Sequence, residues 1–233
     1  MPKKRSKRYE EAAKLVDSDK QYPLSEAVEL VKKFPGIKFD QTVTVSFKMG
    51  VDPRQSDQMV RGTCPLPHGS GKEVRVLVFA EGEAATSAKN AGADHVGYDN
   101  MIKKVQEGWL DFDVVVATPA AMAEVRKLGR QLGPRGLMPN PKTGTVTDDT
   151  AEAVAAVKAG RVDFKLDRNA NISVAIGKAS FEPQQLQDNA EAVIESIIAA
   201  KPASAKGNYL VNGALAATMS PGIKLDISGY RVN

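Results

Sequence analysis

Residues 74–80 read VRVLVFA, an apolar run that only Arg75 interrupts. Residues 114–117 read VVVA, and stretches with helical spacing lie between and after these two runs. Strands of this composition are buried on both faces, as in a parallel sheet that helices cover on both sides. The middle of the chain is therefore predicted to be a doubly wound α/β unit with right-handed crossovers. Its other predicted elements are a short run at 95–98 and helices at 83–91, 100–108, 119–132 and 148–159.

The segments on either side show the period-two pattern of half-exposed strands. Residues 40–50 place Val43, Val45 and Phe47 between polar side chains. Residues 162–166 and 172–176 alternate in the same way, and the polar residues between them predict a β-hairpin. The other predicted elements are helices at 25–34, with Ser25 as N-cap, and 183–200, and strands at 209–219 and 223–227. This pattern indicates an antiparallel sheet with one exposed face.

The fold class expected from the two patterns is α/β plus α+β. A chain of 233 residues is long enough for two modest domains. A discontinuous α+β outer domain with an antiparallel-type sheet would comprise residues 1–67 and 161–233. An α/β domain with a parallel sheet would be inserted between them as residues 68–160.

The composition, 42% hydrophobic and 26% charged, is that of an ordinary soluble globular protein. No run of about 18 apolar residues could span a membrane, and no signal-peptide pattern follows the basic N-terminus, so we expect a cytoplasmic protein without membrane contact. The single cysteine, Cys64, excludes an internal disulfide and argues against a thiolate metal site. We therefore expect no metal and no cofactor.

Charge alone gives a weak indication of a nucleic-acid partner. The formal net charge is +4 and the pI is about 9.0. Five basic residues near the N-terminus more than account for this excess: Lys3, Lys4, Arg5, Lys7 and Arg8. RNA contacts elsewhere would then depend on local basic patches, hydrogen bonds and shape.

Sequence motifs for catalysis are incomplete. His68–Lys72 reads HGSGK, but Glu73 follows where a phosphate-binding loop needs Ser or Thr, and a strand comes next. The first α/β strand is not followed by a Gly-x-Gly-x-x-Gly fingerprint. Cys64 and His95 are interpreted as structural, and Asp111 and Asp113 as part of a solvated loop. No catalytic residue is assigned, so we expect no enzyme activity.

Two segments are candidates for contact with RNA. Residues 37–42 read IKFDQT, with a lysine and an aromatic before a strand, and residues 216–222 read AATMSPG at a strand end. Short hydroxyl side chains on a flat surface would let a nucleic-acid backbone approach closely. An α/β enzyme with an accessory domain and a DNA-binding architectural factor remain as alternatives.

The segment Gly129–Val146, GRQLGPRGLMPNPKTGTV, combines glycines, prolines and basic residues in one irregular path. Together with five other segments it resembles the bacterial ribosomal protein L-one family, over essentially the whole chain. These segments are Asp52–Gln58, Gly92–Asp94, Val125–Leu128, Gly177–Phe181 and Thr218–Pro221.

The resemblance implies a large-subunit ribosomal protein of the mobile stalk, with an inserted Rossmann-like domain. Implied partners are large-subunit rRNA, exit-site tRNA and the mRNA of its own operon, whose translation such proteins repress; it would be a monomer within the ribosome and would not bind DNA. The implied RNA-binding residues are Lys38, Phe39, Thr42, Lys165, Arg168, Thr218, Met219 and Ser220. Secondary RNA or hinge residues would be Arg54, Arg130, Arg135 and Lys142, and the loop at 129–146 would fix the geometry between the domains.

Overall fold

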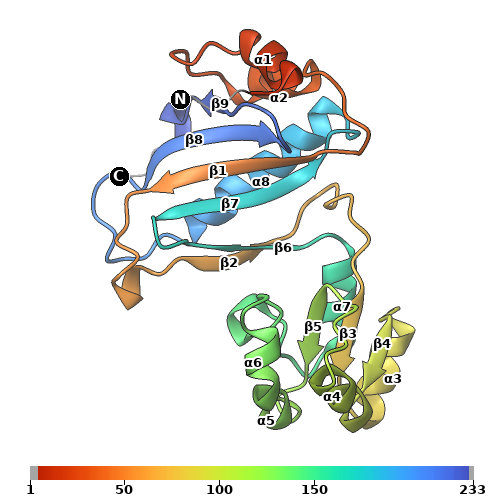
Figure 1. Cartoon of the computed structure of the whole chain (residues 1–233). Coiled ribbons are helices and arrows are strands. Elements are labelled where there is room, and N and C mark those ends of the chain that lie inside the picture. Colours follow the sequence, from red (N-terminus) through yellow and green to blue (C-terminus); the bar gives the residue numbers. More distant parts are fainter. Residues whose placement is uncertain (1–4, 231–233) are drawn as a thin grey trace. The chain divides into compact units, whose positions relative to one another are not determined.

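The computed structural model describes residues 5–230, apart from the side chain of Lys142. Its contacts divide the chain into two compact units (Figure 1). The outer unit contains the residues up to Gly71 and those from Val162 onward, and the inserted unit is Lys72–Arg161. The sequence-based domain boundaries, near residues 67 and 161, stay a prediction.

The outer unit is built on a four-stranded sheet in the order β7-β1-β8-β9, with every neighbouring pair antiparallel. Its strands are β1 (Thr42–Met49), β7 (Asn171–Lys178), β8 (Leu210–Ala217) and β9 (Ile223–Leu225). Along β1 the side chains of Val43, Val45 and Phe47 are buried, while those between them are part-exposed or exposed. The predicted antiparallel sheet with one exposed face is confirmed.

Helices cover one face of this sheet. They are α2 (Leu24–Lys32) and α8 (Pro183–Ala199), and α1 (Lys7–Lys14) adds Ala12 to the same core. Apolar residues of α2 and α8 form one core with the inward side chains of the sheet, and α8 runs behind the strands in Figure 1. The predicted N-cap at Ser25 is wrong: α2 begins one residue earlier, at Leu24, with Pro23 in the extended conformation of an N-cap. Ser25 therefore lies inside the first turn.

The predicted hairpin between 162–166 and 172–176 is also wrong. Strand β6 (Val162–Lys165) pairs with β2 (Arg61–Cys64) in a separate two-stranded sheet, whereas β7 pairs with β1. The turn between them does form, but the Asp167 carboxylate accepts hydrogen bonds from the backbone N–H groups of Asn169 and Asn171, both at 2.7 Å. The turn thus satisfies its own donors, and the two strands separate beyond it.

The inserted unit has a parallel sheet in the order β4-β3-β5, with helices on both faces. One core lies between the sheet and α3 and α7, and a second between the sheet and the helices α4 to α6. The strands are β3 (Val76–Phe79), β4 (His95–Gly97) and β5 (Val114–Ala117). The helices are α3 (Gly82–Asn90), α4 (Asp99–Gln106), α5 (Met122–Val125), α6 (Gly129–Leu132) and α7 (Thr150–Lys158).

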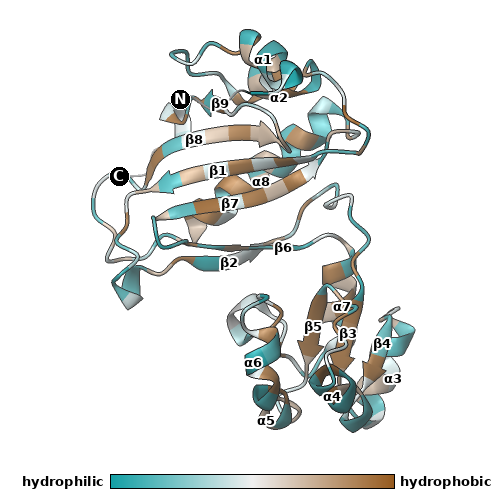
Figure 2. Cartoon of the chain, viewed as in Figure 1, coloured by the Kyte–Doolittle hydropathy of each residue, from teal (hydrophilic) through white to brown (hydrophobic). Residues whose placement is uncertain are grey.

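All four residues of β3 are buried, and Figure 2 shows β3 and β5 as hydrophobic along their length, whereas β1 alternates. The predicted α/β unit is confirmed. The single helix predicted at 119–132 is wrong, because a 3-10 turn, η2 (Arg126–Leu128), separates α5 from α6. Gly129, which begins α6, is a weak helix former at this break. Further 3-10 turns are η1 (Ser56–Gln58), η3 (Pro141–Thr143) and η4 (Ser228–Tyr230).

The glycine- and proline-rich loop is part of the inserted unit. Its end returns to the sheet, where Val146 forms a parallel bridge with Ala117. Inside the loop the buried hydroxyl of Thr145 accepts a hydrogen bond from the Asn140 backbone N–H at 2.8 Å. Arg161, the last residue of the unit, donates from Nη2 to the carbonyl of Thr143 at 2.6 Å. The loop therefore holds the residue from which the chain returns to the outer unit.

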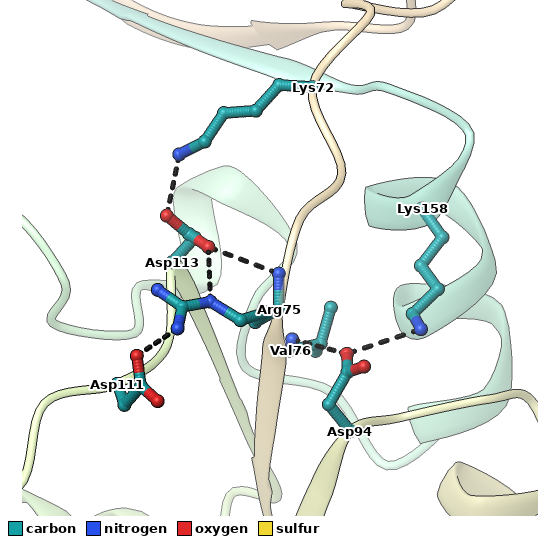
Figure 3. A network of polar contacts seen from close by, with 7 residues as sticks. All are labelled: Lys72, Arg75, Val76, Asp94, Asp111, Asp113 and Lys158. Carbon is teal, nitrogen blue, oxygen red and sulfur yellow. Dashed lines mark hydrogen bonds and ion pairs between the residues drawn. The ribbon is translucent and has the colours of Figure 1, made fainter.

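A network of polar contacts lies at the start of the parallel strands (Figure 3). Asp113 accepts from Lys72 Nζ at 2.6 Å and from Arg75 Nε at 3.2 Å, and Arg75 also pairs with Asp111. On the other side of β3, Asp94 pairs with Lys158 at 3.2 Å. The interpretation of Asp111 and Asp113 as a solvated loop is therefore incomplete, because both carboxylates form ion pairs.

The ammonium of Lys72, with the backbone N–H and guanidinium of Arg75, lowers the pKa of Asp113 to about 2. This folded-state pKa is below the ordinary value of 3.8, so the network stabilises the fold at any pH above about 4 and loses this contribution as the pH falls toward 2. The side chains of Lys72 and Arg75 are 60% and 47% exposed, and solvent screening reduces the contribution to about 1 kcal/mol.

We predict that Asp113→Asn lowers the unfolding free energy of the inserted unit by about 1 kcal/mol at pH 7, and that the difference shrinks as the pH falls from about 4 through 2. Urea denaturation followed by the fluorescence of Trp109 measures this, because the only tryptophan of the chain lies in this unit. Glu73→Gln, which removes an exposed carboxylate nearby, is the control. An Asp113→Asn effect that is as large at pH 2 as at pH 7 would contradict the prediction.

Candidate nucleic-acid interface

Two of the predicted segments meet where β1 begins and β8 ends. The Thr42 N–H donates to the Thr218 hydroxyl at 3.2 Å, and the Thr218 N–H donates to the Thr42 carbonyl at 3.0 Å. The buried side chain of Gln41 donates from Nε2 to the Thr218 carbonyl at 2.8 Å. Residues 39–42 and 217–220 therefore form one continuous surface, although about 175 residues separate them in the sequence.

The Thr218–Ser220 segment is a tight turn that presents Met219 outward. The Ser220 N–H donates to the Ala217 carbonyl at 3.1 Å, and the Ser220 hydroxyl donates to the same carbonyl at 2.9 Å. Met219 has a φ of 61°, a conformation that costs a residue with a Cβ roughly 1–2 kcal/mol. Its side chain is nonetheless 73% exposed. Ser220 thus fixes the turn, and Met219 forms its outer surface.

Lys38 and Phe39 lie in the loop before β1. Both side chains are exposed, Phe39 by 53%. The loop is fixed by Asp40, whose carboxylate accepts from the Ser180 hydroxyl at 2.7 Å and from the Ser180 N–H at 3.1 Å. An aromatic ring is therefore held at the surface beside a lysine and the Thr42–Thr218 contact.

A β-bulge in β7 brings Lys178 to Thr42, and Lys178 is not among the predicted RNA-binding residues. Val43 pairs with Gly177 but Thr44 pairs with Ala175, so Ile176 is an extra residue in β7. Ile176 and Gly177 are both buried, and the next residue, Lys178, reaches the exposed face. Its ammonium donates to the Thr42 hydroxyl at 3.0 Å. The sequence signal was the loss of two-residue alternation at Gly177.

Glycine is required at position 177 because the strand lies close to the core. A Cβ added there would come within 2.9 Å of both Leu186 Cδ2 and Phe181 Cδ2.

We call the residues gathered at this end of the sheet the Thr42 cluster. Its members are Lys38, Phe39, Thr42, Lys178, Thr218 and Met219.

A second group lies at the opposite end of β1, about 23 Å away for a strand of this length. Lys48, Arg54 and Arg168 line one surface hollow there, and we call them the Arg168 cluster. The ammonium of Lys48 donates to the carbonyl of Asn169. Lys165 is exposed on β6 opposite Arg61, in the two-stranded sheet. The predicted RNA-binding residues therefore do not form one patch: they divide between the two clusters, and Lys165 lies outside both.

Asp167 lies beside the Arg168 cluster, and its carboxylate is hydrogen-bonded within its own turn. Hydrogen bonds from the Asn171 and Asn169 backbone N–H groups and from the Asn171 side chain lower the pKa of Asp167 below its ordinary value. A carboxylate bound in this way is directed at its own turn. The lowered pKa keeps Asp167 ionised at neutral pH, so its negative charge remains beside the Arg168 cluster.

Small side chains occupy the exposed face between the two clusters. Ser46 on β1 lies between Ser173 on β7 and Ala214 on β8, and the hydroxyls of Ser46 and Ser173 are 2.9 Å apart. The next row along the strand is Ala175, Thr44 and Ala216. The exposed face of the sheet is thus covered by short side chains, with hydroxyl groups in the middle and cations at both ends.

The remaining predicted residues belong to the inserted unit. Arg130 on α6 and Arg135 in the following turn are exposed. The side chain of Lys142 lies outside the part of the chain that the structure describes. Within residues 5–230, no group of three His, Cys, Asp or Glu residues could hold a metal ion. No helix in the same range is both long and apolar enough to cross a membrane.

Comparison with known proteins agrees with the resemblance seen in the sequence. A family model described as "Ribosomal protein L1p/L10e family" matches residues 30–221. The "Large ribosomal subunit protein uL1" of Lactobacillus delbrueckii subsp. bulgaricus is 58% identical over 226 residues, which cover 97% of each chain. The protein with the same description from Kosmotoga olearia is 56% identical over the same coverage.

We predict that Thr218→Val lowers the unfolding free energy of the outer unit by about 1 kcal/mol, because the Thr42 N–H loses its hydroxyl acceptor. Thr218→Ser keeps the hydroxyl and is the matched control. Urea denaturation followed by far-UV circular dichroism compares the two variants. Hydrogen exchange at the Thr42 amide should also be faster in the valine variant alone. Equal stability and equal exchange in both variants would disprove the role of this hydrogen bond.

Proposed function

Because the chain belongs to the ribosomal protein L1p/L10e family, it is a structural ribosomal protein and not an enzyme, and we propose that it binds large-subunit rRNA through its outer unit. Its place is then the large ribosomal subunit in the cytoplasm. The RNA-binding domain would be residues 1–67 with 161–233. The residues proposed for RNA contact are Lys38, Phe39, Thr42, Lys165, Arg168, Thr218, Met219 and Ser220, together with Lys178.

The Thr42 cluster is the observation that best supports this proposal. It combines two lysine ammonium groups, which suit phosphates, with two exposed apolar side chains, Phe39 and Met219. Exposed aromatic side chains bind unstacked RNA bases by stacking. The backbone around them is held by the hydrogen bonds between Thr42 and Thr218, so binding requires little ordering of the protein.

The sheet face with short side chains between the two clusters suits a structured RNA. Side chains cannot read the deep major groove of an A-form helix, so proteins contact its phosphates, its 2′-hydroxyls and its irregular junctions. Hydroxyl groups such as those of Thr44 and Ser46 can donate to or accept from a 2′-hydroxyl. The Arg168 cluster would then provide a second set of phosphate contacts, with Arg54 as a secondary residue.

We further propose, from the family resemblance, that the protein assists the movement and release of exit-site tRNA and represses translation of its own operon mRNA. A surface that recognises RNA by shape accepts any RNA that presents the same shape, which gives repression a physical basis. Arg130, Arg135 and Lys142 of the inserted unit are candidates for secondary RNA contact or for a hinge role. The protein would act as a monomer within the ribosome.

Nuclease protection tests the rRNA proposal. The purified chain is mixed with protein-free large-subunit rRNA, digested, and the retained RNA is sequenced. We expect one protected segment that includes a junction or an internal loop. Competition at matched salt with duplex DNA of the same length distinguishes the DNA-binding alternative. Equal competition by DNA, or the absence of a discrete protected segment, would disprove specific rRNA binding.

We predict that Phe39→Ala weakens binding to the protected segment by about 1–3 kcal/mol, at least about fivefold in Kd, because a stacked base loses its partner. Filter binding at fixed salt measures the change. Leu15→Ala is the control, since Leu15 is also an exposed apolar residue of the outer unit but lies at the end of α1. Equal losses in the two variants would mean that Phe39 contributes only general surface hydrophobicity.

A further inference from the structure

Helix α1 brings an arginine to the Thr42 cluster. Arg8 Nη2 donates a hydrogen bond to the carbonyl of Met219 at 2.9 Å, across 211 positions of sequence. Met219 has a positive φ, and its carbonyl lies within the turn that ends β8. The first helix of the chain therefore contacts the turn at one of the most exposed apolar side chains of the outer unit.

The position of Arg8 is fixed by the helix that carries it. Ser6 caps α1 by accepting a hydrogen bond from the Tyr9 N–H at 3.3 Å, and Ala12 is buried in the core of the outer unit. The guanidinium of Arg5 lies 4.6 Å from the centre of the Tyr9 ring, on the same turn. Arg8 itself is part-exposed. A capped and docked helix thus holds this side chain at the cluster.

Among the residues that the structure describes, Arg8 uses one of its N–H donors, in the bond to Met219. A guanidinium has five N–H donors, and a backbone carbonyl takes one of them without neutralising the charge. Within residues 5–230, the structure pairs Arg8 with no carboxylate. A part-buried arginine that keeps its charge and a fork of donors is well suited to a phosphate.

We propose that the RNA interface extends onto helix α1 and that Arg8 binds a phosphate of the RNA while it holds the carbonyl of Met219. This inference rests on the proposed rRNA binding of the outer unit. Arg8 would contribute in two ways: one N–H fixes the turn that presents Met219, and the others contact the RNA backbone. The basic N-terminal segment would then include one specific contact and not only a diffuse positive charge.

The test is the salt dependence of binding to the protected rRNA segment, measured with the full chain. Each phosphate contact contributes about 0.7–0.9 to the slope of log Kobs against log salt concentration. We expect Arg8→Ala to weaken binding about tenfold at moderate salt and to reduce the slope by about that amount. Arg8→Gln, which retains a donor for Met219 without the charge, should show the same reduced slope. Arg8→Lys, which keeps the charge, should retain the wild-type slope.

Lys14→Ala is the matched control, because it removes one exposed positive charge from the other end of the same helix. Its slope should equal that of the wild type. An unchanged slope in Arg8→Ala, or an equal reduction in Lys14→Ala, would overturn the assignment of a phosphate contact to Arg8. Failure of the wild-type chain to bind the segment would instead refute the proposed function. Urea denaturation of each variant verifies that the outer unit remains folded.

Discussion

The position of β1 between β7 and β8 is the constraint on which the outer unit depends. Every residue of β1 has a partner in β8 or β7, and both partners come from beyond the inserted unit. Two further features follow from this arrangement. The inward residues of β1 meet α2 and α8 in one core, and the outward residues form the middle of the exposed face. The Thr42 cluster exists because this strand starts where β7 and β8 both end.

Local sequence patterns predicted most of the elements, because burial on one or both faces of a strand determines its composition. The alternation in β1 and the apolar run of β3 correctly indicated a half-exposed antiparallel sheet and a buried parallel one. Pairing was less predictable. The turn at Arg168 has the composition of a hairpin, but β6 pairs with β2, a strand of four residues with little periodicity. Which strands pair depends on distant segments, which local turn signals do not include.

The candidate site shows the same limit. Phe39, Thr42, Thr218 and Met219 could be named from the sequence, and the structure brings their segments together. The sequence could not predict that the Arg168 cluster is separate from these residues, because the separation follows from the direction of β1 in the sheet. Lys178 depends on a bulge, and Arg8 on the docking of a helix against a turn 211 positions away. Such residues are found only when long-range packing is known.

The order of strands also has a consequence for the time at which this surface appears during synthesis. The inserted unit is contiguous and is complete once residue 161 has been made. Strand β1 is made much earlier but has no partner until β7 exists, and its second partner, β8, is made later still. Every truncated nascent chain that ends before β8 therefore lacks the Thr42–Thr218 contact. If the proposed RNA surface includes this contact, only chains that have been made beyond β8 can present it in full.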